Sequence, residues 1–266
     1  MKEAQNNPVI EVVNLERRIK FGNFLTILII GSAVLNALLN AQNLFKDTVS
    51  IFYVNIGLIA LFNCLVILEI IKNRFPKEIY GLRIDNWKKS VKTSILVSLL
   101  VIILITFLKW IFITYFDVFK DYPLFEFPDF PQQNKSIIIF ILFIGYIFHA
   151  GMQELLFRGF IQGSLQHYLR GSFTKLRSSI LATIIFAGAH LHLGLLFTAV
   201  IVPFSFLWGF LFSRFNSILP SFISHGIIGL YALFAINFEK IILSVYHQEF
   251  FDKIMNNITL FQNLCH

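Results

Sequence analysis

Long apolar runs separated by short polar segments dominate the pattern of this chain. About 20 consecutive apolar residues cross a bilayer as a helix. By this measure the sequence predicts seven spans, at 21–40, 50–71, 91–116, 137–157, 179–193, 195–213 and 217–237. Gly194 and Pro203 interrupt the apolar run around the fifth and sixth spans. The expected fold is therefore all-α, a polytopic transmembrane bundle of about seven to eight helices.

The composition agrees with a membrane protein. Of the 266 residues, 56% are hydrophobic and only 14% are charged, whereas about 25% of the residues of a soluble domain are charged. The net charge of +7 does not require nucleic acid, because Lys and Arg gather in cytoplasmic loops and near anionic lipid. We expect membrane lipid and no nucleic acid as partners. Cys64 and Cys265 give neither a disulfide framework nor a zinc spacing.

The basic residues also predict the orientation. Most lie before the first span, between the second and third, and after the fourth, and cytoplasmic loops carry such an excess. We therefore expect a multi-pass protein of a bacterial cytoplasmic membrane with a cytoplasmic N-terminus. The chain divides into a cytoplasmic N-terminal segment at 1–20, a transmembrane domain at 21–237 with its core at 80–235, and an amphipathic tail at 238–266.

Polar residues inside the apolar runs are the candidate functional residues. The fourth run ends in QELLFR, residues 153–158, and an ionisable residue in a span costs roughly 2.5–3.5 kcal/mol on insertion scales. Glu154 and Arg158 are four apart and share a helix face; the simpler interpretation is a neutralising salt bridge at a helix end. His190 and His225 lie in later runs. The predicted topology brings all these residues between the cytoplasmic surface and the midplane, around a conical cavity open toward the cytoplasmic side.

Other polar residues have plainer interpretations. Ser224 precedes His225, and neighbouring residues on a helix do not face each other, so this serine is not expected to be a nucleophile. Lys109 is interpreted as an interfacial lysine. His192 is expected near water at a helix end. The glycines and glutamines of 159–166 predict close helix packing or a broken helix with a polar lining.

In the order and spacing of these residues the chain resembles the CPBP family (CAAX proteases and bacteriocin-processing enzymes), also called the Abi family. Its EExxxR motif corresponds to residues 153–158, its FxxxH motif to Phe186 and His190, and its third histidine to His225. The GLRIDNWKKS stretch at 81–90 resembles the GLR…W segment that often precedes the family core. The resemblance covers about 80–235. It implies an intramembrane glutamate endopeptidase, related to the type II CAAX prenyl endopeptidase, without a metal or other cofactor.

Two positions depart from the family pattern. Gln153 stands where the family has the glutamate that activates water, and an amide is not a useful base. Gly229 stands where the family often has a polar residue that helps to hold the oxyanion. Three interpretations remain open: an engineered inactivating change at Gln153, a natural subfamily in which Glu154 is the base, or a catalytically impaired relative that serves as a membrane binding, immunity or regulatory protein.

The first hypothesis is hydrolysis of a peptide bond near the membrane surface, in a peptide or membrane-protein substrate. A glutamate and His190 would hold the water, His225 would donate to the oxyanion, and Arg158 would orient the carboxylate. Phe186 and Gly229 would contact the substrate. A second enzyme hypothesis is a zinc protease, since one Glu and two His form an acceptable ligand set, here Glu154, His190 and His225. A transporter is disfavoured because the chain has no repeated half.

Overall fold

The computed structural model describes residues 8–41, 51–73, 76–116, 119–127 and 135–237. Across these ranges the regular structure is entirely helical, which confirms the predicted all-α class. The α-helices are α1 (Pro8–Ala41), α2 (Ile51–Asn73), α3 (Trp87–Tyr115), α4 (Lys135–Glu154), α5 (Gly163–Tyr168), α6 (Thr174–Ala189), α7 (Leu195–Phe215) and α8 (Ile218–Phe234). Lys77–Tyr80 and Leu191–Leu193 form 3-10 helices, and Leu155–Gln162 forms a π-helix.

The lengths and apolar character of these helices make the chain an integral membrane protein. Among the described residues, 4 helical segments are long and apolar enough to cross a bilayer: Arg18–Ala41, Trp87–Tyr115, Lys135–Tyr168 and Leu195–Phe215. The third segment is a continuous rod made of α4, the π-helix and α5. The predicted last span corresponds to α8, which is apolar but shorter.

The ends of two helices can be compared with the predicted spans. Helix α1 starts at Pro8, and its part that is long and apolar enough to cross a bilayer is Arg18–Ala41, close to the predicted 21–40. The polar part of this helix carries an ion pair: Glu16 and Lys20 are one turn apart, and Glu16 Oε1 lies 2.6 Å from Lys20 Nζ. Helix α6 ends at Ala189, earlier than the predicted 193. The predicted amphipathic tail at 238–266 lies outside the described residues.

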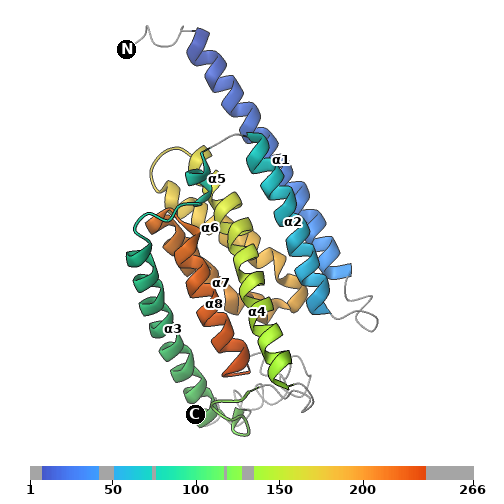
Figure 1. Cartoon of the computed structure of the whole chain (residues 1–266), viewed down its shortest axis with the longest axis vertical. Coiled ribbons are helices and arrows are strands. Elements are labelled where there is room, and N and C mark those ends of the chain that lie inside the picture. The colour runs from blue at the N-terminus through green and yellow to red at the C-terminus, as the bar shows by residue number, and fades with distance from the viewer. Residues whose placement is uncertain (1–7, 42–50, 74–75, 117–118, 128–134, 238–266) are drawn as a thin grey trace, which may run out of the picture.

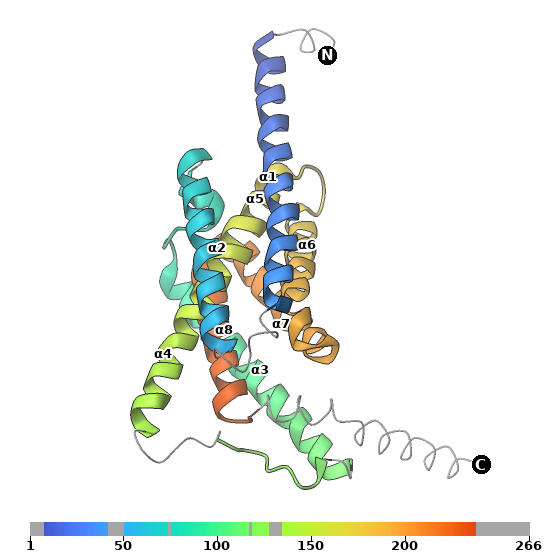
Figure 2. The ribbon, with the colours of Figure 1, turned by 90° about the vertical axis from the view of Figure 1, so that its right-hand side faces the viewer.

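The helices form a bundle around the rod of α4, the π-helix and α5. Helices α1, α3 and α8 run in one direction and α2 and α4 in the other, as the ribbon shows (Figure 1). Helix α3 packs along α8 and α6 packs along α7, while α4 lies between α2 and α8. The N-terminal part of α1 projects beyond the other helices in both views (Figure 2).

Glycines let the π-helix and α5 approach the 3-10 helix Lys77–Tyr80 very closely. A Cβ added at Gly159 would lie 3.0 Å from the Tyr80 carbonyl oxygen, and one at Gly163 would lie 2.3 Å from the Ile79 carbonyl oxygen. Tyr80 itself is buried and stacks on Phe160, with ring centroids 6.4 Å apart. The close packing and the irregular helix that the composition of 159–166 predicts are therefore both present.

We expect Gly163→Ala to destabilise the protein by about 1–3 kcal/mol, because the new methyl group overlaps a backbone oxygen that cannot move independently. The measurement is the apparent thermal unfolding temperature of the purified protein in detergent. Gly188→Ala on α6 is the matched control, since its Cβ would meet nothing within 4 Å and Ala favours a helix over Gly. Equal unfolding temperatures for the two variants would contradict this account of the packing.

Candidate active site

A buried ion pair stands where α4 passes into the π-helix. The side chains of Glu154 and Arg158 are both 0% exposed, and Arg158 Nε lies 3.6 Å from Glu154 Oε2. Removing a carboxylate and a guanidinium from water costs several kcal/mol per ion unless each finds partners. The pair therefore needs further contacts, and these come from three other helices.

Arg158 reaches α7 with its second terminal nitrogen. Its Nη2 donates to Ser205 Oγ at 2.7 Å, and Nη1 donates to Gln162 Oε1 at 3.4 Å. The Gln162 amide nitrogen in turn donates to the Gly209 carbonyl oxygen at 2.8 Å and to Ser213 Oγ at 2.9 Å. The guanidinium also lies 5.6 Å from the centroid of the Phe186 ring. Arg158 is thus held by fixed polar groups on the π-helix and α7.

Glu154 is bonded to the histidine of α8. Its Oε1 accepts a hydrogen bond from His225 Nδ1 at 2.8 Å. The imidazole lies flat on the indole of Trp208, with centroids 3.8 Å apart and an interplanar angle of 8°. Because Nδ1 carries the hydrogen that the carboxylate accepts, a neutral His225 has its lone pair on Nε2. A carboxylate in this position fixes both the tautomer and the orientation of the ring.

Gln153 faces the other histidine. His190 is the first residue after α6, and its Nδ1 donates to the Phe186 carbonyl oxygen at 2.7 Å. A carbonyl oxygen can only accept, so Nε2 of the neutral ring is an acceptor. The Gln153 amide nitrogen lies 3.4 Å from this atom and donates to it. The amide therefore matches a neutral His190.

The ring of Phe186 lies near both histidines. Its centroid is 4.4 Å from that of His190 and 6.3 Å from that of His225. The predicted site residues are thus gathered at one place from the rod, the end of α6 and α8. The two neighbouring residues Gln153 and Glu154 do not share a partner: the first contacts His190 and the second contacts His225.

A family model described as Rce1-like, type II CAAX prenyl endopeptidase Rce1-like, matches residues 135–231. The match runs from the start of α4 into α8 and includes every site residue named above. This stretch is similar to that family, and we refer to it as the Rce1-like region. The finding is consistent with the CPBP resemblance of the sequence. No curated protein and no solved structure matches the chain.

Gly229, the second departure in the Rce1-like region, is closed off by an aromatic side chain. A Cβ added there would lie 1.6 Å from Tyr146 Oη and 2.4 Å from its Cζ. Tyr146 comes from α4, and its ring lies 6.3 Å from that of His225. Sequence reasoning missed this residue, because one tyrosine in an apolar run carries no signal of its own.

Other polar residues outside this cluster have structural contacts. Lys109, interpreted from the sequence as an interfacial lysine, is 7% exposed, and its Nζ donates to the Ile236 carbonyl oxygen at 2.8 Å, just beyond the end of α8. Ser224 accepts a hydrogen bond from Ser98 of α3 at 3.0 Å. In the described ranges no group of His, Cys, Asp and Glu side chains is arranged to hold a metal ion, so the zinc set is not assembled there.

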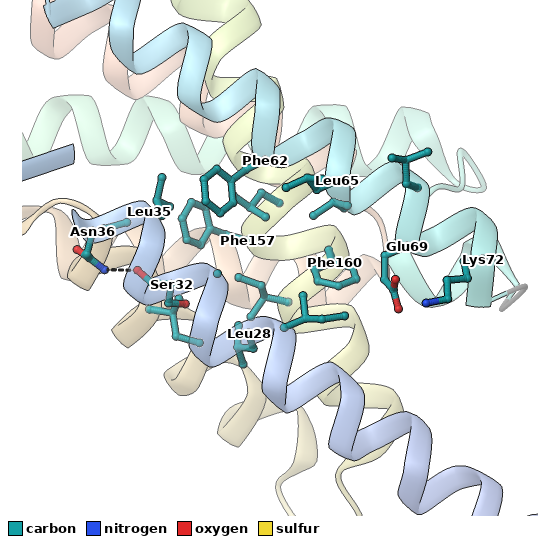
Figure 3. A pocket seen from close by; sticks show the side chains of 18 residues that line it. Leu28, Ser32, Leu35, Asn36, Phe62, Leu65, Glu69, Lys72, Phe157 and Phe160 are labelled. Carbon is teal, nitrogen blue, oxygen red and sulfur yellow. Dashed lines mark hydrogen bonds between the residues drawn. The ribbon is translucent and has the colours of Figure 1, made fainter. Parts of the chain in front are cut away.

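A cavity of about 370 Å³ lies beside the π-helix (Figure 3). Its walls come from α1, α2, the π-helix and α6, and they are almost wholly apolar. Glu69 and Lys72 of α2 stand together at one end. The cavity borders the site through Phe157, whose ring contacts that of Phe186 edge-on at 5.0 Å, and through Ala189, which precedes His190.

We expect Arg158→Met to destabilise the Rce1-like region by about 3–5 kcal/mol, since it leaves the buried Glu154 without its counter-charge. Adding Glu154→Gln removes that charge and should restore part of the lost stability. The measurement is the apparent unfolding temperature of both variants in the same detergent. If the double variant unfolds at or below the temperature of Arg158→Met, charge burial does not organise this site.

Proposed function

We propose that the chain is a membrane-embedded endopeptidase in which His225, oriented by Glu154, is the general base for water. The observation that carries the proposal is the 2.8 Å hydrogen bond between His225 Nδ1 and the fully buried Glu154 carboxylate. This bond directs the lone pair of the imidazole to Nε2. The Rce1-like description of residues 135–231 supplies the reaction class.

The buried position of Glu154 argues against a direct encounter between its carboxylate and water. One oxygen accepts from His225 and the other faces Arg158, and no part of the side chain is exposed. The carboxylate therefore acts through the imidazole. It stabilises the imidazolium that forms when the ring takes up a proton, as carboxylate–histidine pairs do in hydrolases.

The proposed reaction has two steps. His225 Nε2 removes a proton from water while the water oxygen bonds to the carbonyl carbon of the peptide, which gives a tetrahedral oxyanion. The carbon–nitrogen bond then breaks, and the imidazolium returns its proton to the leaving amine. No metal, oxidant or second substrate is needed for this balance.

Glu154→Gln and His225→Ala should each lower kcat by about 100- to 10,000-fold, because they remove the orienting charge and the base. The assay is cleavage of peptide libraries by the protein in lipid nanodiscs, with products identified by mass spectrometry. Ser224→Ala is the matched control, since that hydroxyl bonds to α3 and should not affect turnover. Unchanged cleavage by His225→Ala would overturn the proposal.

A second candidate, a non-catalytic membrane binding protein, is favoured by one observation. The amide of Gln153 occupies the position where the family has its water-activating glutamate, and it is bonded to His190. The same assay separates the two candidates. Cleavage by Gln153→Glu together with none by the native chain would show that the native chain is catalytically impaired and favour the binding protein; cleavage by the native chain would exclude the second candidate.

The cavity beside the π-helix supports a substrate with an apolar segment. Its lining matches a hydrocarbon chain, and Phe157, which lines the cavity, contacts Phe186 of the site. The family description names a prenyl endopeptidase, so peptides with and without a prenyl group are the natural pair of substrates to compare.

Gly31→Phe should raise KM roughly tenfold or more for the preferred substrate with little change in kcat, since it fills an apolar binding space. Gly31 lines the cavity, where its nearest neighbour is Phe62 at 3.8 Å from an added Cβ. Gly22→Phe on the same helix is the control, because an added Cβ there meets nothing within 4 Å. An equal KM for the two variants would show that substrate does not enter the cavity.

A further inference from the structure

The space beside Gly229 is filled by the hydroxyl end of Tyr146. An added Cβ at Gly229 would lie 1.6 Å from Oη, 2.4 Å from Cζ and 2.9 Å from Cε1 of this side chain. Each of these distances is far below van der Waals contact, so no larger residue fits at 229 while Tyr146 keeps its position. The space that a polar side chain at position 229 would occupy is therefore not empty, because the hydroxyl group of Tyr146 lies there.

The Tyr146 side chain lies beside residues of the candidate site. Gly229 follows His225 by one helical turn on α8, so the two positions share a face of that helix. The Tyr146 ring meets the His225 ring at 72°, with centroids 6.3 Å apart. On α4, Tyr146 precedes Gln153 by about two turns and lies on the same face. The phenol therefore projects from the rod toward the histidine of α8.

The hydroxyl also has an unused hydrogen. Among the described residues no group forms a hydrogen bond with Tyr146 Oη, whereas Tyr231, on α8, bonds to Thr106 of α3. A neutral phenol is a hydrogen-bond donor, and a developing oxyanion requires such a donor; this one lies at Gly229, one helical turn from His225.

We propose that Tyr146 is a catalytic residue whose Oη donates a hydrogen bond to the oxyanion of the tetrahedral intermediate, in place of the side chain that Gly229 lacks. The inference rests on the proposed peptidase function. The phenol keeps its proton throughout: it forms no covalent bond, and the oxyanion loses its charge again when the carbon–nitrogen bond breaks. In this proposal Tyr146 of α4 supplies the hydrogen-bond donor, and Gly229 of α8 leaves the space that its side chain occupies.

Tyr146→Phe removes the hydroxyl and keeps the ring. We expect kcat for peptide cleavage to fall about 100- to 1,000-fold, the usual effect of deleting one oxyanion donor, with KM nearly unchanged. Affinity for a peptide phosphonate, which imitates the tetrahedral oxyanion, should weaken in parallel, whereas affinity for the intact peptide should not. Tyr231→Phe is the control for loss of a tyrosine hydroxyl elsewhere on the same bundle and should keep wild-type kcat.

A swap of the two positions tests the geometry directly. Tyr146→Ala clears the space, and the double variant Tyr146→Ala with Gly229→Asn restores a donor from α8; it should recover at least tenfold of the lost kcat. Wild-type kcat and phosphonate affinity in Tyr146→Phe would overturn the role of Tyr146 alone. A wild-type chain that cleaves no peptide would overturn the proposed function itself, so the two failures are distinguishable.

Discussion

A fully buried carboxylate must be surrounded by compensating groups, and in this protein Glu154 sets that requirement for the centre of the bundle. Arg158 supplies the opposite charge one turn further along, but the guanidinium is equally buried and has its own needs. Ser205 of α7 and Gln162 accept hydrogen bonds from its two terminal nitrogens. His225 of α8 donates to one carboxylate oxygen, while the other faces Arg158 Nε at 3.6 Å without a hydrogen bond. One charged side chain thus fixes the rod against two further helices.

The neighbouring Gln153 and Glu154 show how a single helix serves two histidines. Successive side chains on a helix point about 100° apart, so they cannot share a partner. Glu154 accepts the Nδ1 hydrogen of His225. Gln153 contacts Nε2 of His190, whose Nδ1 hydrogen is already donated to a carbonyl oxygen. A carboxylate at 153 would face the lone pair of His190 Nε2 and would need an additional proton or water between them.

The sequence revealed the site where its chemistry contrasts with the surroundings. Glu154, Arg158, His190 and His225 stand out in apolar runs, and the structure gathers them. Tyr146 is one aromatic residue among the 32 Phe and 8 Tyr of the chain, so only the space that Gly229 leaves identifies it. The end of α6 at Ala189 was missed for a similar reason: Leu191 and Leu193 continue the apolar pattern through the 3-10 helix.

The π-helix joins the polar site to the apolar cavity by dividing its residues between them. Leu156, Phe157, Phe160 and Ile161 line the cavity, while Arg158 and Gln162 point into the hydrogen-bonded cluster. A π-helix is rare and is frequently found at functional sites, and here it contributes residues both to the apolar cavity and to the polar cluster. Phe157 contacts Phe186, whose ring in turn lies near both histidines. Packed aromatic rings therefore connect the wall of the cavity at Phe157 with His190 and His225.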